Sequence, residues 1–123
     1  MKKIISLSLL LATIGFADMQ DAEILAEKKC GECHLMGVTS KEKLDKMKAP
    51  PYWAIARKTK EAFATNEERV KFIVDYTFNP KEEKMLFAKD AKIRFGLMPS
   101  QEGKVSKEEI ELISTYILRM VED

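Results

Sequence analysis

Both cysteines and the only histidine of this 123-residue chain lie together in Cys30-Gly31-Glu32-Cys33-His34. Two thiols three residues apart, followed at once by an imidazole, form the pattern to which a c-type haem is attached. If these residues end a helix, Cys30, Cys33 and His34 share one face, because positions i, i+3 and i+4 align on a helical surface. The thiols can then bond to two neighbouring vinyl groups while the imidazole reaches the iron. The spacing therefore predicts one covalently bound haem c, with His34 as an axial ligand.

Two other kinds of site use paired cysteines. A structural zinc site takes four ligands, so a carboxylate would have to join the two cysteines and one histidine of this chain. A thiol–disulfide couple of the thioredoxin kind is expected at the start of a helix that follows a strand, where the helix dipole lowers the thiol pKa. Here a helical pattern precedes Cys30 and no strand pattern does. We therefore favour haem over both alternatives.

The second axial ligand of the iron must be a residue other than histidine, since His34 has no counterpart in the chain. Methionine is the leading candidate, because methionine and histidine together ligate the haem of electron carriers. Met36 is too close to His34 to reach the opposite face of the haem. Met19 and Met120 lie in or beside the expected terminal helices. Met47, Met85 and Met98 remain.

Met98 lies in the segment 95–100, where Gly96 and Pro99 favour an irregular loop that can cross the face of the ring. We predict Met98 as the second ligand, with Met85 as the fallback. If no methionine binds, the open position would bind small gases or peroxide, and the protein would be a sensor or a peroxidase.

The first 17 residues have the pattern of a secretory signal peptide. Lys2 and Lys3 precede an apolar run over residues 4–14, and small residues follow at Gly15 and Ala17. The run is shorter than the roughly 20 residues that cross a bilayer, so a permanent membrane anchor is the less favoured alternative. We expect cleavage after Ala17, export to a bacterial periplasm and a single domain over residues 18–123, without stable membrane insertion.

The charge of the chain is nearly balanced. Of its 21 basic residues Lys2 and Lys3 belong to the leader, which leaves 19 against 20 acidic residues. This balance argues against nucleic acid as a partner. Residues 34–105 carry 15 basic and 10 acidic residues, whereas both ends of the mature chain are acidic. We expect this basic middle to surround an exposed haem edge and to meet an acidic patch on a redox protein partner.

Hydrophobic spacing predicts helices and no strand, so we expect the all-α class. The first helix is expected over residues 21–29, capped by Asp18 or Asp21. Further helices are expected over residues 52–60, after Thr65 with Glu68 in a capping box, over 81–94, and after Ser106 in a second capping box. A loop with a short turn near 41–47 separates the first two. Met85, Leu86 and Ile93 are expected to face inward, and so is the stripe from Ile110 to Met120.

The attachment motif near the start, Gly96-Leu97-Met98-Pro99 late in the chain and a final helix with Tyr116-Ile117 together resemble a small class I bacterial cytochrome c. The resemblance covers residues 18–123. It implies a cytochrome c fold of three to five short helices around one haem, in which the first and last helices cross, with Tyr116 at the crossing. It also implies that the carbonyl of Pro50 or Pro51 accepts the proton of the histidine ligand.

The resemblance implies a monomeric one-electron carrier, not an enzyme, that shuttles between a membrane-bound donor and a terminal oxidase, reductase or peroxidase. A haem subunit or sensor of a larger complex, and a haem-free thiol oxidoreductase, are the alternatives. Trp53 and Arg57 are candidates for contacts with the haem propionates. A core position for Trp53 and a solvated one for Arg57 are equally compatible with the sequence.

Overall fold

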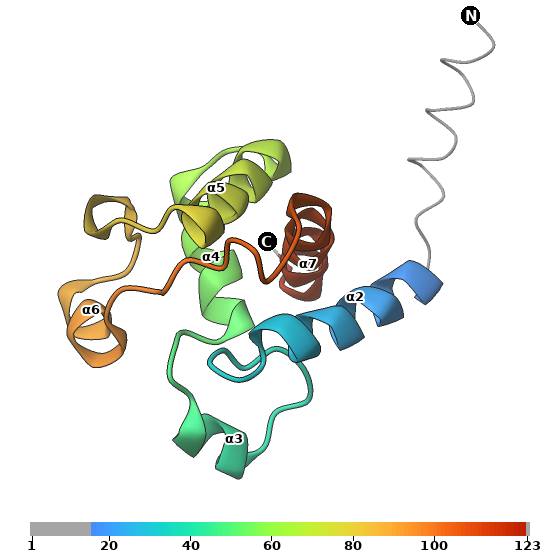
Figure 1. Ribbon diagram of the computed structural model, residues 1–123, viewed down its shortest axis with the longest axis horizontal. Coiled ribbons are helices and arrows are strands. Elements are labelled where there is room, and N and C mark those ends of the chain that lie inside the picture. Colours follow the sequence, from blue (N-terminus) through green and yellow to red (C-terminus); the bar gives the residue numbers. More distant parts are fainter. Residues whose placement is uncertain (1–15, 123) are drawn as a thin grey trace, which may run out of the picture.

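The structure is a computed structural model that describes residues 16–122 and is all-helical over that range (Figure 1). Its α-helices and one 3-10 helix are, in chain order, α2 Phe16–Cys30, α3 Lys41–Lys46, α4 Tyr52–Ala62, α5 Asn66–Phe78, η1 Glu82–Lys84, α6 Lys89–Phe95 and α7 Lys107–Met120. The expected all-α class is confirmed. The expectation of three to five helices was wrong, because the described residues already contain six α-helices.

The predicted signal peptide falls almost wholly outside the described residues, since only Phe16 and Ala17 of it belong to them. Within residues 16–122 no helix is long and apolar enough to cross a membrane. Helix α2 begins at Phe16, before the expected position. Asp18 and Asp21 therefore lie inside α2, and the expectation that one of them caps its start was wrong.

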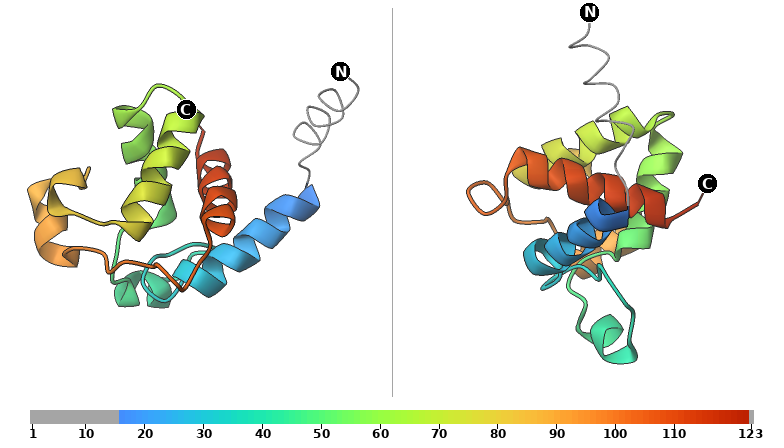
Figure 2. Two further views of the ribbon diagram at one scale, coloured as in Figure 1. Left: turned by 45° about the horizontal axis from the view of Figure 1, so that its top comes forward. Right: turned by 90° about the vertical axis from the view of Figure 1, so that its right-hand side faces the viewer.

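The core is built around α7, against which α2, α4 and α5 all pack (Figures 1 and 2). The buried apolar residues of α7 are Ile110, Ile113, Tyr116, Ile117 and Leu118. Helix α2 contributes Ala22 and Ala26, both fully buried, and such small side chains let two helices approach closely. Met120, expected on the same stripe, is 49% exposed because it lies at the last position of the helix.

Capping contacts fix the starts of α5 and α7. At α7 the capping box is complete, since the Glu109 N–H donates to Ser106 Oγ over 3.1 Å and the Ser106 N–H donates to Glu109 Oε1 over 2.8 Å. At α5 the Glu68 N–H donates to Thr65 Oγ1, but the Glu68 carboxylate accepts from the Thr65 hydroxyl rather than from its backbone. The box expected there is only half formed.

Helices α3, η1 and α6 lie outside the core and contain no buried residue (Figures 1 and 2). Instead of one helix over 81–94, the chain forms η1 and α6 with residues 85–88 between them. Ile93, expected to face inward, is 74% exposed.

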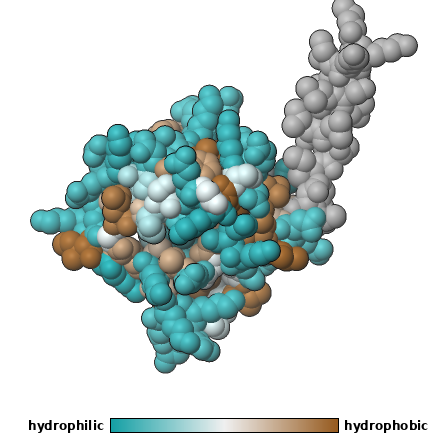
Figure 3. All heavy atoms as spheres, viewed as in Figure 1, coloured by the Kyte–Doolittle hydropathy of each residue, from teal (hydrophilic) through white to brown (hydrophobic). Residues whose placement is uncertain are grey.

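Polar side chains cover most of the face in Figure 3, and apolar ones appear between them in separate patches. Of the three helices α3, η1 and α6 only α6 lines the cavity described below, through Ala91 and Phe95.

Candidate functional site

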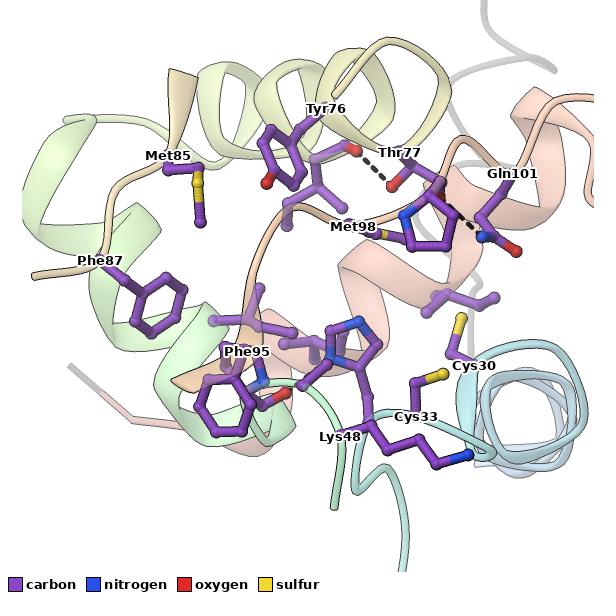
Figure 4. Close-up of a pocket in the computed structure, with 18 of the residues that line it drawn as sticks. Cys30, Cys33, Lys48, Tyr76, Thr77, Met85, Phe87, Phe95, Met98 and Gln101 are labelled. Carbon is purple, nitrogen blue, oxygen red and sulfur yellow. Dashed lines mark hydrogen bonds between the residues drawn. The ribbon is translucent and has the colours of Figure 1, made fainter. Parts of the chain in front are cut away.

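The attachment motif forms one extra turn at the end of α2. The helix ends at Cys30, and the next residues continue its hydrogen bonding, because the His34 N–H donates to the Cys30 carbonyl over 2.9 Å. This bond spans four residues, as in an α-helix, so the motif keeps the helical repeat that the sequence predicted. Cys30 and Cys33 are free thiols, both half-buried, and both line the same cavity (Figure 4).

His34 is held by a hydrogen bond between its Nδ1 and the carbonyl oxygen of Pro50, 2.6 Å away. A carbonyl oxygen only accepts, so Nδ1 carries the proton and donates, and Nε2 keeps its lone pair. Burial lowers the pKa of His34, an effect partly opposed by this hydrogen bond. A neutral imidazole with Nε2 unprotonated is the form in which histidine ligates a metal. Of the two prolines left open by the sequence, the structure identifies Pro50.

The cavity has a volume of about 330 Å³, within the range of small-molecule and cofactor pockets. It lies between the attachment motif, the buried side of α7, the inner face of α5 and the segment from η1 to the loop before α7. Much of its lining is aliphatic or aromatic, including Ile55, Phe72, Phe95, Ile110, Ile113 and Ile117. A large flat apolar group attached to Cys30 and Cys33 would pack against this surface.

Some of the methionines line this cavity and others do not. Met98 and Met85 both line it, and Figure 4 shows them on different elements, Met98 beside Thr77 and Met85 toward Phe87. Met36 also lines it but belongs to the buried core cluster two residues after His34. Met47 does not line it. The structure therefore brings the predicted ligand, Met98, and the fallback, Met85, to the cavity that His34 lines.

Trp53 and Arg57 are not brought to this cavity. They line a separate hollow together with Tyr52, Met120, Val121 and Glu122. The Trp53 ring packs edge-on against Tyr52, with the ring centroids 5.2 Å apart. The lining of the cavity therefore does not support the predicted contacts of Trp53 and Arg57 with haem propionates, which stay a prediction.

Four lysines that sequence reasoning missed line the cavity: Lys29, Lys48, Lys58 and Lys104. The only acidic residue among the lining residues is Glu32. The excess of basic residues over 34–105 was the sequence signal for three of them, but it did not say which lysines surround the site, and Lys29 lies outside that range. Glu61 lies 3.4 Å from the Lys58 ammonium and offsets one of these charges, so the lining remains positive through the other three lysines.

The Cys30 thiol is poorly suited to redox exchange. Burial, together with the neighbouring Cys33, raises the pKa of Cys30 to about 11. A thiol with so high a pKa is almost entirely protonated at neutral pH, whereas thiol–disulfide exchange uses the thiolate. The motif also follows a helix, whereas thiol couples of the thioredoxin kind precede one.

A directly coordinated metal ion finds no ready donor set in this part of the chain. Among residues 16–122, no group of three or more histidine, cysteine or acidic side chains is arranged to hold a metal ion. Haem needs fewer protein ligands, since its macrocycle supplies four donors and the protein supplies one or two.

Comparisons with protein-family models, with curated proteins and with solved structures gave no match for this chain.

Proposed function

We propose that this chain binds one haem c covalently through Cys30 and Cys33 and acts as a one-electron carrier. The observation that carries the proposal is a single apolar cavity lined by both cysteines, by His34 and by Met98. The bound haem would supply an iron centre that gains and loses one electron. In this proposal the chain binds, orients and shields that centre and carries out no bond-making step.

Each residue has a separate part in this proposal. Cys30 and Cys33 prevent loss of the cofactor. His34 would hold the iron through Nε2, since the Pro50 carbonyl fixes the ring plane and keeps the proton on Nδ1. Met98 would hold it through the thioether sulfur, a pairing that raises the reduction potential of a haem relative to two imidazoles. The apolar lining would shield the group from water.

The partner that we propose is a redox protein with an acidic contact surface. Lys29, Lys48 and Lys104 are exposed and line the cavity, so they would lie near the edge of a bound haem. Opposite charges on the partner would speed the encounter at low ionic strength, and salt would screen that attraction. We further propose export to the periplasm with cleavage after Ala17, because attachment of haem to these thiols follows export.

The decisive experiment measures the mass and the spectra of the exported protein. We expect residues 18–123 plus one haem that survives denaturation, and a methionine–iron band in the oxidised state. Met98→Ala should abolish the band. Met47→Ala is the matched control, since Met47 does not line the cavity, and it should leave the band unchanged. Loss of the band in Met85→Ala instead would assign Met85 as the ligand, and an unmodified mass would refute the haem proposal.

The partner proposal needs its own test. The rate of electron exchange with an acidic one-electron redox protein should fall between low and moderate ionic strength. Lys48→Glu should lower the low-salt rate more than Lys71→Glu, because Lys71 is exposed on α5 but does not line the cavity. A rate that is independent of salt, or equal in the two variants, would contradict docking at the cavity rim.

The exposed apolar residues Ile93 and Leu97 favour a second candidate, a haem subunit held permanently in a larger complex. They are 74% and 50% exposed and lie at the end of α6 and just after it, where the chain also lines the cavity. A permanent partner would cover them. Co-purification of a stoichiometric partner with the exported protein, lost in Ile93→Ser, would favour this candidate over a diffusible carrier.

A further inference from the structure

The loop that carries Met98 is tied to the last turn of α5. Ser100 Oγ donates to the Phe78 carbonyl oxygen over 2.7 Å, and the Gln101 N–H donates to the Thr77 carbonyl oxygen over 3.0 Å. Two successive residues of α5, Thr77 and Phe78, thus hold residues 100 and 101, which follow Met98 and Pro99.

These contacts satisfy groups that the helix cannot satisfy by itself. The last four carbonyls of an α-helix have no partner within the helix, and α5 ends at Phe78. Two of these carbonyls, those of Thr77 and Phe78, accept from the Met98 loop. Figure 4 shows Thr77, Met98 and Gln101 close together, with a dashed hydrogen bond between Thr77 and Gln101.

Little else fixes the position of this loop. It begins at Gly96, whose φ of 72° is the left-handed conformation that glycine adopts most easily, and Leu97 and Pro99 are exposed. The preceding helix α6 has no buried residue. The bond from Gln101 Nε2 to the Pro99 carbonyl, 2.8 Å, shapes the loop internally but does not attach it to the core. The hydrogen bonds of Ser100 and Gln101 to the end of α5 are therefore the main attachment of the loop that carries Met98.

We infer that Ser100 is a positioning residue for the methionine ligand: it holds the Met98 loop closed against the end of α5, so that the Met98 sulfur stays within the cavity. This inference rests on the proposed haem function. The Ser100 side chain does not need to touch the iron. Loss of its hydrogen bond to Phe78 should make the loop open more often, and each opening should free the iron position that Met98 occupies.

Imidazole added to the oxidised holoprotein tests the inference, because it binds the iron only after the methionine leaves. A neutral hydrogen bond contributes a factor of roughly five to such an equilibrium. We therefore expect Ser100→Ala to raise the apparent imidazole affinity about fivefold. Ser100→Thr, which keeps the hydroxyl, should restore the parent affinity. Hydrogen exchange at the Gln101 amide should accelerate in Ser100→Ala, and this second readout does not involve the iron.

Ser40→Ala is the matched control, since Ser40 caps α3 on an exposed loop and its hydroxyl accepts from Lys43 rather than contacting the Met98 loop. It should leave imidazole binding unchanged even if the protein unfolds slightly more easily. Parent-like imidazole affinity in Ser100→Ala would overturn the inference while the methionine–iron band of the parent still supported the haem proposal. A haem-bound parent without that band would overturn the inference but leave haem attachment intact.

Discussion

The hydroxyl of Tyr116 offers the clearest test of how the core supports the attachment motif. Tyr116 is 3% exposed, and its OH donates to the Met36 carbonyl oxygen over 3.1 Å, which links α7 to the segment just after His34. Tyr116→Phe removes only this bond and keeps the ring. The net value of one hydrogen bond is about 1 kcal/mol, and an unpaired buried carbonyl costs about 1–3 kcal/mol. We expect the free energy of unfolding to fall by about 1–2.5 kcal/mol.

Guanidinium unfolding of the holoprotein, followed by far-UV circular dichroism, measures this change. For a domain of about 100 residues the melting temperature should fall by roughly 4–8 °C per kcal/mol.

Burial raises the pKa of Tyr116 to about 12, with smaller contributions from Glu23, Tyr52 and Glu27. The folded state thus holds this proton more tightly than the unfolded state. The extra stability of the parent is present below the ordinary pKa near 10 and is lost as pH rises toward 12.

The control is Thr115→Val on the same helix. Its hydroxyl bonds only to the Glu111 carbonyl within α7, so its loss should change the free energy of unfolding by no more than about 0.5 kcal/mol. Equal unfolding midpoints for the parent and Tyr116→Phe would refute the reasoning, because the bond to Met36 would then contribute nothing. Equal losses in Tyr116→Phe and Thr115→Val would attribute the effect to α7 alone.

Three further predictions concern the helix start, the core and the periphery. The Ser106 backbone N–H lowers the pKa of Glu109 from its ordinary value of 4.5. The stability that this carboxylate contributes is therefore complete above that value and is lost as pH falls through the lower folded pKa. The urea midpoints of the parent and Glu109→Gln should converge in acid, and a constant difference would contradict this. Ile117→Ala should cost about 2–5 kcal/mol in chemical unfolding, whereas Ile93→Ala, at an exposed position, should cost no more than about 0.5 kcal/mol. Chain produced without haem should be cut by protease first within residues 41–46 or 81–95, because α3, η1 and α6 contain no buried residue, and first cuts within α7 would contradict this.

Sequence patterns predicted those structural features that depend only on residues close together in the chain. The capping box of Ser106 and Glu109 and the spacing of Ile110, Ile113 and Ile117 were sufficient to predict α7 and its buried side, because both signals are complete within a few residues. The same reasoning failed over 81–94, where a run compatible with a helix lacks a strong apolar stripe and the chain forms η1 and α6 instead. It also failed for Ile93, whose burial depends on what lies opposite it.

By itself the sequence determined the all-helical class and the helical spacing that brings Cys30, Cys33 and His34 together, since helix propensity, capping and the spacing of three side chains are local properties. Only the tertiary structure decided that Pro50 holds His34, that lysines rather than Trp53 and Arg57 line the cavity, and that the end of α5 holds the Met98 loop. The physical reason is that each of these contacts joins residues distant in the chain. No local pattern records which distant groups meet when the helices pack around α7.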